Sequence, residues 1–84
     1  MSRVVFMIKP NWDAGYDVLR DGSWVGSAMT RESIRQLAFS LADKVALTGT
    51  VALIALEDGH GEVISVEWVD PPVVVPEVEL ANPS

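Results

Sequence analysis

Residues 30–49, TRESIRQLAFSLADKVALTG, are the one stretch of this 84-residue chain with a clear helical period. Its apolar side chains recur at intervals of three and four residues, which places them on one stripe of a helix. The stripe consists of Ile34, Leu37, Ala38, Leu41, Ala42 and Val45. Thr30 can accept a hydrogen bond from the free amides of the first turn, and Gly49 can adopt the left-handed conformation that closes a helix. We therefore predict one helix between these two residues.

Strands are predicted before the helix. Residues 3–9, RVVFMIK, are rich in β-branched and aromatic side chains and end at Pro10. Both faces of this strand are apolar, which is typical of a strand covered on both sides. Residues 16–28 contain two further strands around Asp21-Gly22, the dipeptide that best suits a two-residue hairpin turn.

Two more strands are predicted after the helix. Residues 50–57, TVALIALE, form an apolar run, and residues 62–70, EVISVEWVD, alternate between apolar and polar side chains. In the second strand we expect Ile64, Val66 and Trp68 to meet the helix. The predicted order is β-β-β-α-β-β, an α+β fold in which one helix packs on one face of an antiparallel sheet of about five strands.

The end of the domain is predicted at the prolines that follow the last strand, because proline supplies no donor to a strand ladder. We expect residues 1–70 to form a single domain and residues 71–84 to form an extended or disordered, acidic, proline-containing tail. Residues 73–75 of this tail, Val-Val-Val, could instead add to a sheet edge.

Charge is distributed unevenly along the chain, whose net charge is −6. Residues 1–44 contain all six basic residues and five acidic ones, whereas residues 45–84 contain seven acidic residues and no basic one. A net negative protein is repelled by phosphate backbones, so nucleic-acid binding is disfavoured. The absence of cysteine excludes disulfides and thiolate metal sites and fits a cytoplasmic protein. The apolar run at residues 4–8 is too short for a signal peptide or a membrane span, so no membrane association is predicted.

His60, the single histidine, lies near the acids Glu57, Asp58 and Glu62. Carboxylates and imidazole can share a divalent metal ion, but this spacing matches no known metal-binding loop, and a plain hairpin turn is the better interpretation. His60 could also serve a nucleophilic serine, for which the candidates are Ser23, Ser27 and Ser65. No serine has the flanking glycines of a nucleophile elbow. We therefore predict no metal, no cofactor and no enzymatic activity.

Three tryptophans are the main candidates for a binding surface. Large aromatic side chains build small cores and protein interfaces, and they can also stack on unpaired bases. The predicted interface consists of Val5, Met7, Trp12, Tyr16, Trp24, Val73, Val74 and Val75. In the alternative, single-stranded nucleic acid binds the sheet aromatics and basic residues between positions 3 and 35, with Arg3, Lys9 and Arg20 as contacts.

The acidic C-terminal half permits a second alternative. Clustered carboxylates can mimic a phosphate backbone, so the chain could inhibit a basic nucleic-acid-binding protein. Acidic residues on strand exteriors also keep a hydrophobic small protein soluble, and this interpretation is favoured here.

The motifs of the chain resemble those of the DUF2188 family of small bacterial domains of unknown function. The resemblance rests on W-x-x-x-Y-D-V-x-R-D-G-S at residues 12–23, T-R-E-S-I-R-Q-L-A-x-x-L-A at residues 30–42 and E-D-G-H-G-E-V at residues 57–63. It covers about residues 4–69 and implies the same order of hairpin, helix and hairpin. Because that family has no established activity, the resemblance implies no catalytic residue.

The sequence therefore predicts a cytoplasmic bacterial domain that acts by binding, as a homodimer formed through its sheet. One helix can cover one face of a sheet whose strands are apolar on both sides, so the other face requires a partner. A second copy is the simplest such partner, and the sequence identifies no other physiological protein partner or pathway.

Overall fold

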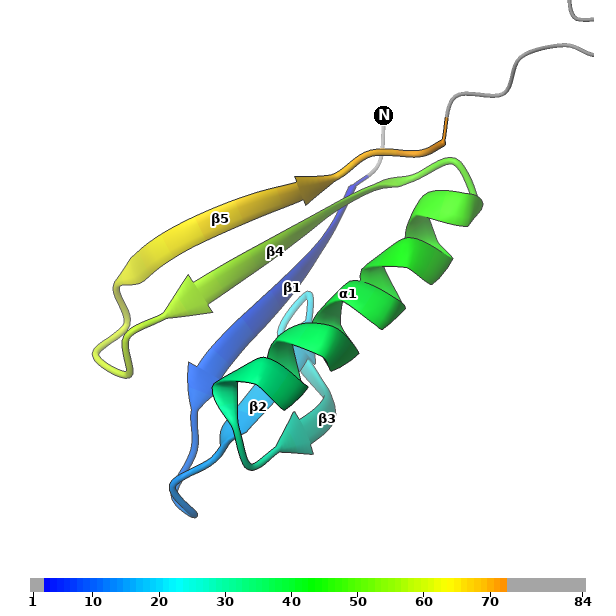
Figure 1. Cartoon of the computed structure of the whole chain (residues 1–84). Helices are drawn as coiled ribbons and strands as arrows, with labels where there is room; N and C mark the ends of the chain where they lie inside the picture. Colours follow the sequence, from blue (N-terminus) through cyan, green and yellow to red (C-terminus); the bar gives the residue numbers. More distant parts are fainter. Residues whose placement is uncertain (1–2, 73–84) are drawn as a thin grey trace, which may run out of the picture.

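A computed structural model describes residues 3–72, in which one helix packs on one face of a five-stranded sheet (Figure 1). The elements in chain order are β1 (Arg3–Pro10), β2 (Tyr16–Arg20), β3 (Ser23–Ala28), α1 (Arg31–Leu47), β4 (Val51–Glu57) and β5 (Val63–Val69). The predicted α+β order is confirmed, with strand ends within one or two residues of those predicted. Most of the predicted tail, from residue 73 onward, lies outside the described residues.

The sheet is mixed, so the prediction of a purely antiparallel sheet was wrong. Its strand order is β3-β2-β1-β4-β5, and β4 pairs with β1 in parallel, whereas the other neighbouring strands pair antiparallel. Two antiparallel pairings leave β3 running in the same direction as β1, and α1 then returns the chain to the starting end of the sheet. β4 must therefore run parallel to β1, through a helical crossover of the kind that parallel pairing requires.

Both predicted ends of the helix are confirmed. The Thr30 side chain accepts a hydrogen bond of 3.1 Å from the backbone N–H of Ser33, which satisfies one free amide of the first turn. At the other end Thr48 is the last capping residue, and Gly49 follows with a positive φ of 90°. Its backbone N–H donates to the carbonyl of Ala46 at 2.9 Å.

The core lies between α1 and the strands β1, β2 and β4. The predicted helical stripe is confirmed in the part that faces the sheet, because Ile34, Ala38 and Ala42 are fully buried. They pack with Phe6 of β1 and Val18 of β2, which are also buried. Alanine at two successive turns lets the helix backbone approach the sheet closely, so this part of the core has no room for larger side chains.

The predicted hairpin between β2 and β3 has the predicted turn. Asp21 and Gly22 both have positive φ, 48° and 92°, as a type I′ turn requires. Asp21 is also tied to β1: its backbone N–H donates to the carbonyl of Val5 at 2.9 Å, and its carboxylate accepts from the Val5 N–H at 3.1 Å. These bonds fix the tip of the hairpin against the central strand.

β5 turns the opposite face toward the helix from the one predicted. Glu67 lies opposite Ile54 in the ladder and forms an ion pair with Arg35 of α1. Val66 and Trp68 consequently point away from the helix, and they are 48% and 58% exposed. Ile64, beside the bulge at the start of β5, is also more than half exposed. Alternation groups the side chains that share a face but does not say which group meets the helix.

Overpacking the tight helix–sheet contact is expected to destabilise the fold. Ala38→Leu should lower the free energy of unfolding by about 1–3 kcal/mol, because a fully buried alanine leaves no space for three more carbons. Gln36→Leu, on the exposed side of the same helix, is the matched control and should change it by less than about 0.5 kcal/mol. Urea unfolding followed by circular dichroism measures both; equal effects would contradict the described packing.

Candidate functional site

An apolar surface lies on the face of the sheet opposite α1. One row of paired residues crosses all five strands, in the order Trp24, Leu19, Met7, Ala55 and Val66. Residues paired across neighbouring strands project their side chains to the same face and lie side by side. The row is therefore continuous from one edge of the sheet to the other.

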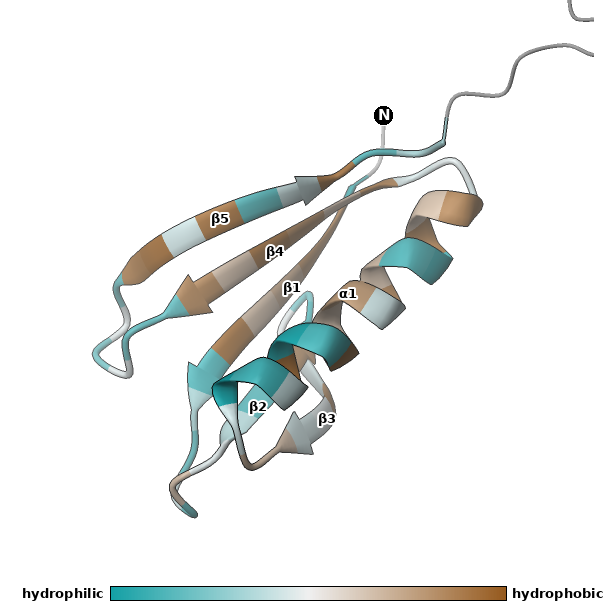
Figure 2. Cartoon of the chain, viewed as in Figure 1, coloured by the Kyte–Doolittle hydropathy of each residue, from teal (hydrophilic) through white to brown (hydrophobic). Residues whose placement is uncertain are grey.

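A second row lies beside the first and consists of Val5, Leu53 and Trp68. We call the eight residues of the two rows the open face. Trp24 is 63% exposed there, whereas Phe6 on the helix side of the sheet is 1% exposed. Apolar residues run along β1, β4 and β5 in Figure 2, although α1 covers only one side of these strands. The open face thus has the composition of a core without a covering layer.

Polar residues border the open face and hold one of its tryptophans in place. Asp17 of β2 pairs with Lys9 of β1, at one end of the open face. The Asp17 carboxylate accepts hydrogen bonds from the indole Nε1 of Trp24 at 3.3 Å and from the Asn11 side-chain amide at 3.1 Å. An apolar centre with a polar rim is the usual anatomy of a protein interface.

The structure brings together part of the predicted interface. Val5, Met7 and Trp24 all belong to the open face. Trp12 instead lies in the loop between β1 and β2, where its side chain is fully exposed. Tyr16 packs against the core on the helix side and does not belong to the open face. The predicted contacts Val73, Val74 and Val75 lie outside the described residues. The open face also contains five residues that the prediction did not include: Leu19, Leu53, Ala55, Val66 and Trp68. The alternation of β5 had already grouped Val66 and Trp68.

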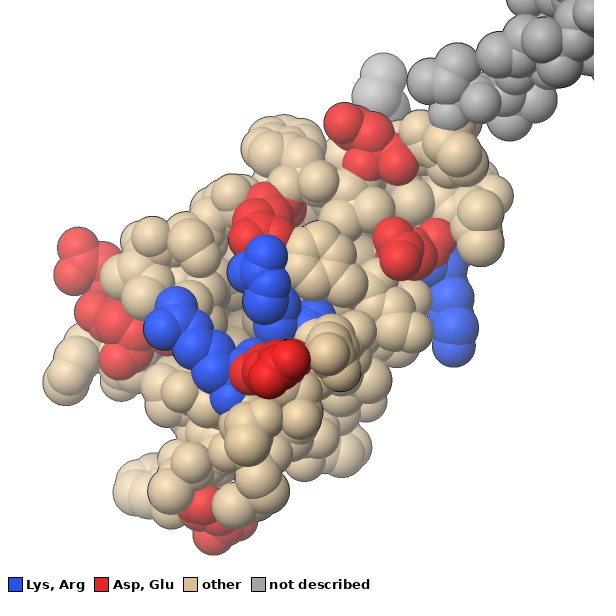
Figure 3. Space-filling view, in the orientation of Figure 1, with Lys and Arg blue, Asp and Glu red and all other residues tan. Residues whose placement is uncertain are grey.

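The three predicted nucleic-acid contacts do not form one basic patch. Arg3 and Lys9 lie at opposite ends of β1, and Arg20 lines a groove on the helix side of the sheet. Basic side chains gather instead near the first turns of α1 (Figure 3), where Arg31 and Arg35 line a small cleft. No cluster of cations therefore borders the exposed tryptophans within residues 3–72.

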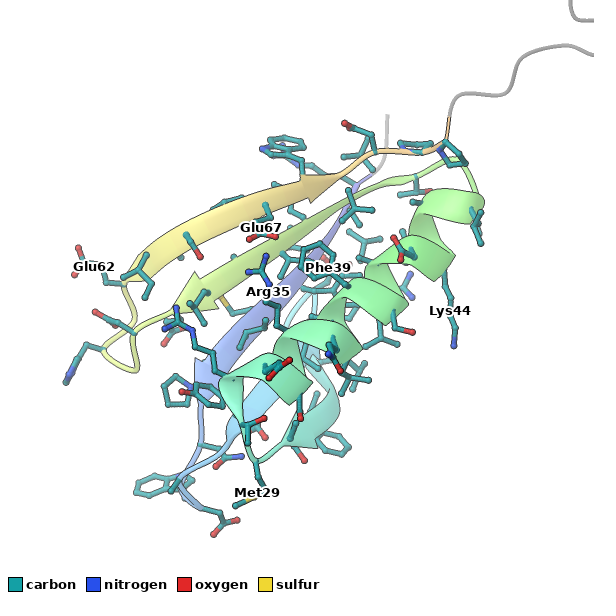
Figure 4. All side chains as sticks on the ribbon, in the orientation of Figure 1. Met29, Arg35, Phe39, Lys44, Glu62 and Glu67 are labelled. Carbon is teal, nitrogen blue, oxygen red and sulfur yellow. The ribbon has the colours of Figure 1, made fainter. Side chains whose placement is uncertain are left out.

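Arg35 joins the helix to the edge strand β5. Its guanidinium contacts both carboxylate oxygens of Glu67, at 2.7 and 3.1 Å, and lies 5.0 Å from the ring centre of Phe39 one helical turn later (Figure 4). The cleft beside it has a volume of about 50 Å³, far below the several hundred Å³ of sites for small organic ligands. The spacing of Arg35 and Phe39 indicates a shared helix face, but the pairing with Glu67 depends on the tertiary structure.

The turn around His60 is held by hydrogen bonds to the carboxylates of two neighbouring residues, Glu57 and Asp58. Asp58 accepts hydrogen bonds from the backbone N–H groups of His60 at 2.7 Å and Glu62 at 3.2 Å, and Glu57 accepts one from Gly61 at 3.1 Å. The bond from His60 holds the pKa of Asp58 below its ordinary value of 3.8, against the opposing effect of burial. These three hydrogen bonds describe a hairpin turn. Residues 3–72 contain no group of three or more potential metal ligands.

No protein-family model, no curated protein and no solved structure matches this chain. The resemblance to DUF2188 therefore stays a prediction. No helix within the described part of the chain is long and apolar enough to cross a membrane.

The contact between Arg35 and Glu67 is expected to show a measurable coupling. A double-mutant cycle with Arg35→Ala and Glu67→Ala should give about 0.2–1 kcal/mol of coupling free energy in urea unfolding, as is usual for a solvent-exposed ion pair. Arg31 lines the same cleft without an ion pair to Glu67 in the described structure, so a cycle with Arg31→Ala should give a coupling near zero. A larger coupling in the control cycle would contradict the described orientation of β5.

The Asp58 carboxyl is expected to titrate below 3.8 in the folded chain. A depressed pKa means that the carboxylate stabilises the folded state above the unfolded pKa, and this stabilisation is lost as pH falls through the folded value. Carboxyl-detected NMR should give a lower midpoint for Asp58 in the folded chain than in urea. In Asp58→Asn the free energy of unfolding should lose the part of its acidic pH dependence that the titration of Asp58 causes. Identical folded and unfolded midpoints would show that the turn is not formed.

Proposed function

We propose that this chain is a small non-catalytic binding domain that acts as a homodimer, with the open face as the interface between the two copies. The proposal rests on one observation: eight apolar residues form two adjoining rows on the sheet face opposite α1, and three of them, Trp24, Val66 and Trp68, are 63%, 48% and 58% exposed. Contiguous exposed apolar surface of this kind marks interaction sites in soluble proteins.

The orientation of β5 supports the proposal. An edge strand with one face on a helix and one face in water normally places its apolar residues toward the helix. β5 does so only at Val69, which packs against the core, whereas Glu67 lies on the helix side and Val66 and Trp68 lie on the outer side. This arrangement is favourable only if the outer side is also removed from water.

A second copy suits the open face because the centre of the face is apolar and uncharged. The centre of the face carries no charge, so two copies with a net charge of −6 each can meet there without opposing carboxylates. Trp24 and Trp68, both more than half exposed, together offer roughly 200–300 Å² of apolar surface, given about 150–250 Å² for a whole aromatic side chain. Val66 adds to this surface with 48% exposure, whereas Ala55 is 5% exposed and adds little.

The two alternatives from the sequence have less support. Binding of single-stranded nucleic acid would require cations beside the tryptophans, but Arg20 lies on the other side of the sheet from Trp24. Mimicry of nucleic acid would require a surface on which carboxylates are gathered. Asp17 and Asp58 are instead engaged in hydrogen bonds that fix a side chain and a turn.

Sedimentation equilibrium tests the homodimer. The full chain should be a dimer at micromolar concentration, and Val66→Asp should raise the dissociation constant at least about 100-fold, because an unpaired buried carboxylate costs several kcal/mol. Val25→Asp is the matched control: Val25 has a similar exposure, 40%, but lines the groove on the helix side, so its dimer should persist.

Tryptophan fluorescence gives a second measurement that needs no variant. Dilution of the dimer should shift the emission to longer wavelength as Trp24 and Trp68 enter water. A strict monomer of the unmodified chain at high micromolar concentration, or equal effects of the two aspartate variants, would contradict the proposal. A salt-dependent quenching by an oligonucleotide, in a monomeric chain, would favour the nucleic-acid alternative.

A further inference from the structure

A groove of about 270 Å³ lies on the helix side of the sheet, between α1 and the strands β1 to β3. Its lining is apolar at the base and includes two cations and two hydroxyls: Val4, Phe6, Arg20, Val25, Leu41, Lys44, Val45, Thr48 and Thr50. We call this site the cationic groove. The two cations come from different elements. Arg20 is the last residue of β2, and Lys44 lies in the last turns of α1, where Figure 4 labels it. Neither forms an ion pair with another residue between 3 and 72.

We propose that residues 73–80 of the same chain, VVVPEVEL, bind in the cationic groove. The segment combines five apolar residues with Glu77 and Glu79. In an extended segment Glu77 and Glu79 project to one side and Val78 and Leu80 to the other. The apolar side chains then fill the base of the groove, while the two carboxylates meet Arg20 and Lys44.

The end of the described chain lies close enough for this contact. Val69 pairs with Ala52 at the start of β4, and Thr50 at one end of the groove directly precedes that strand. Figure 1 shows the ends of β5 and α1 at the same end of the molecule. Eight extended residues span about 26 Å, whereas α1 rises only about 10 Å between Leu41 and Thr48. The segment is therefore long enough to follow the whole groove.

Proline at position 76 also suits this occupant. It has no backbone N–H, so a segment around it binds through side chains better than as an added strand of the sheet. The binding of this segment is independent of the proposed homodimer, because the cationic groove and the open face lie on opposite sides of the sheet. A variant in the groove therefore tests only the bound segment, and a variant in the open face tests only the homodimer.

Carbodiimide cross-linking of the full chain tests the contact. The reagent joins a lysine amine to a carboxylate in direct contact, and the chain has only two lysines, Lys9 and Lys44. Mass spectrometry should find Lys44 joined to Glu77 or Glu79, and no tail cross-link at Lys9, whose neighbour in the sheet is Asp17. A mixture of isotope-labelled and unlabelled chains should give the product within one chain. A product only between chains, or none at Lys44, would overturn the proposal.

Proteolysis gives a second, independent measurement. A glutamate-specific protease should cleave after Glu77 and Glu79 about two- to fivefold faster in Lys44→Glu than in the unmodified chain, because the charge reversal removes an attraction of ordinary ion-pair strength. Lys9→Glu makes the same charge change outside the groove and should leave the rate unchanged. Val25→Asp should speed cleavage without changing the sedimentation of the dimer. Val66→Asp should change the sedimentation and leave the cleavage rate unchanged. Equal rates in Lys44→Glu and Lys9→Glu would overturn the proposal.

Discussion

One helix has to cover a sheet whose central strands are apolar on both faces. β1 places Phe6 and Ile8 on one side and Val5 and Met7 on the other, and β4 repeats this pattern beside it. The 17-residue α1 buries only the first side. Apolar surface removed from water stabilises a protein by about 25 cal/mol per Å². Burial of the uncovered side against a partner would therefore be favourable. The other features of the molecule follow from this imbalance.

The parallel pairing of β1 and β4 positions the helix over the middle of the sheet. Because α1 connects β3 at one edge with β4 beyond the centre, it crosses the face of β2 and β1, and its alanines 38 and 42 permit close packing there. β5 lies beyond the reach of the buried stripe. Val69 packs against the core near the end of β5, and in the middle of the strand the contact with the helix is the ion pair between Arg35 and Glu67. Val66 and Trp68 are left on the outer side.

The two sides of the sheet offer different surfaces. The open face is broad and uncharged at its centre and suits a second copy of the same shape. The cationic groove has a volume of about 270 Å³, is lined by apolar side chains and by cations from β2 and α1, and suits an extended acidic segment with apolar side chains. A homodimer formed through the open face leaves both grooves on the outside. A further partner with the same chemistry as residues 73–80 would therefore suit the cationic groove and not the open face.

Much of the fold was determined by local sequence. The period of the helical stripe, Thr30 and Gly49 at the ends of α1, and Asp21-Gly22 in the hairpin are decided by neighbouring residues, and the structure confirms each of them. The direction in which a strand pairs, and the face that it turns toward the helix, depend on contacts between residues far apart in the chain. Neither the parallel pairing of β4 nor the outward orientation of Val66 and Trp68 follows from the period of a strand, because period 2 is the same for either direction and either face. The sequence thus determined that the strands have two apolar faces, and only the tertiary structure decided which residues the helix leaves uncovered.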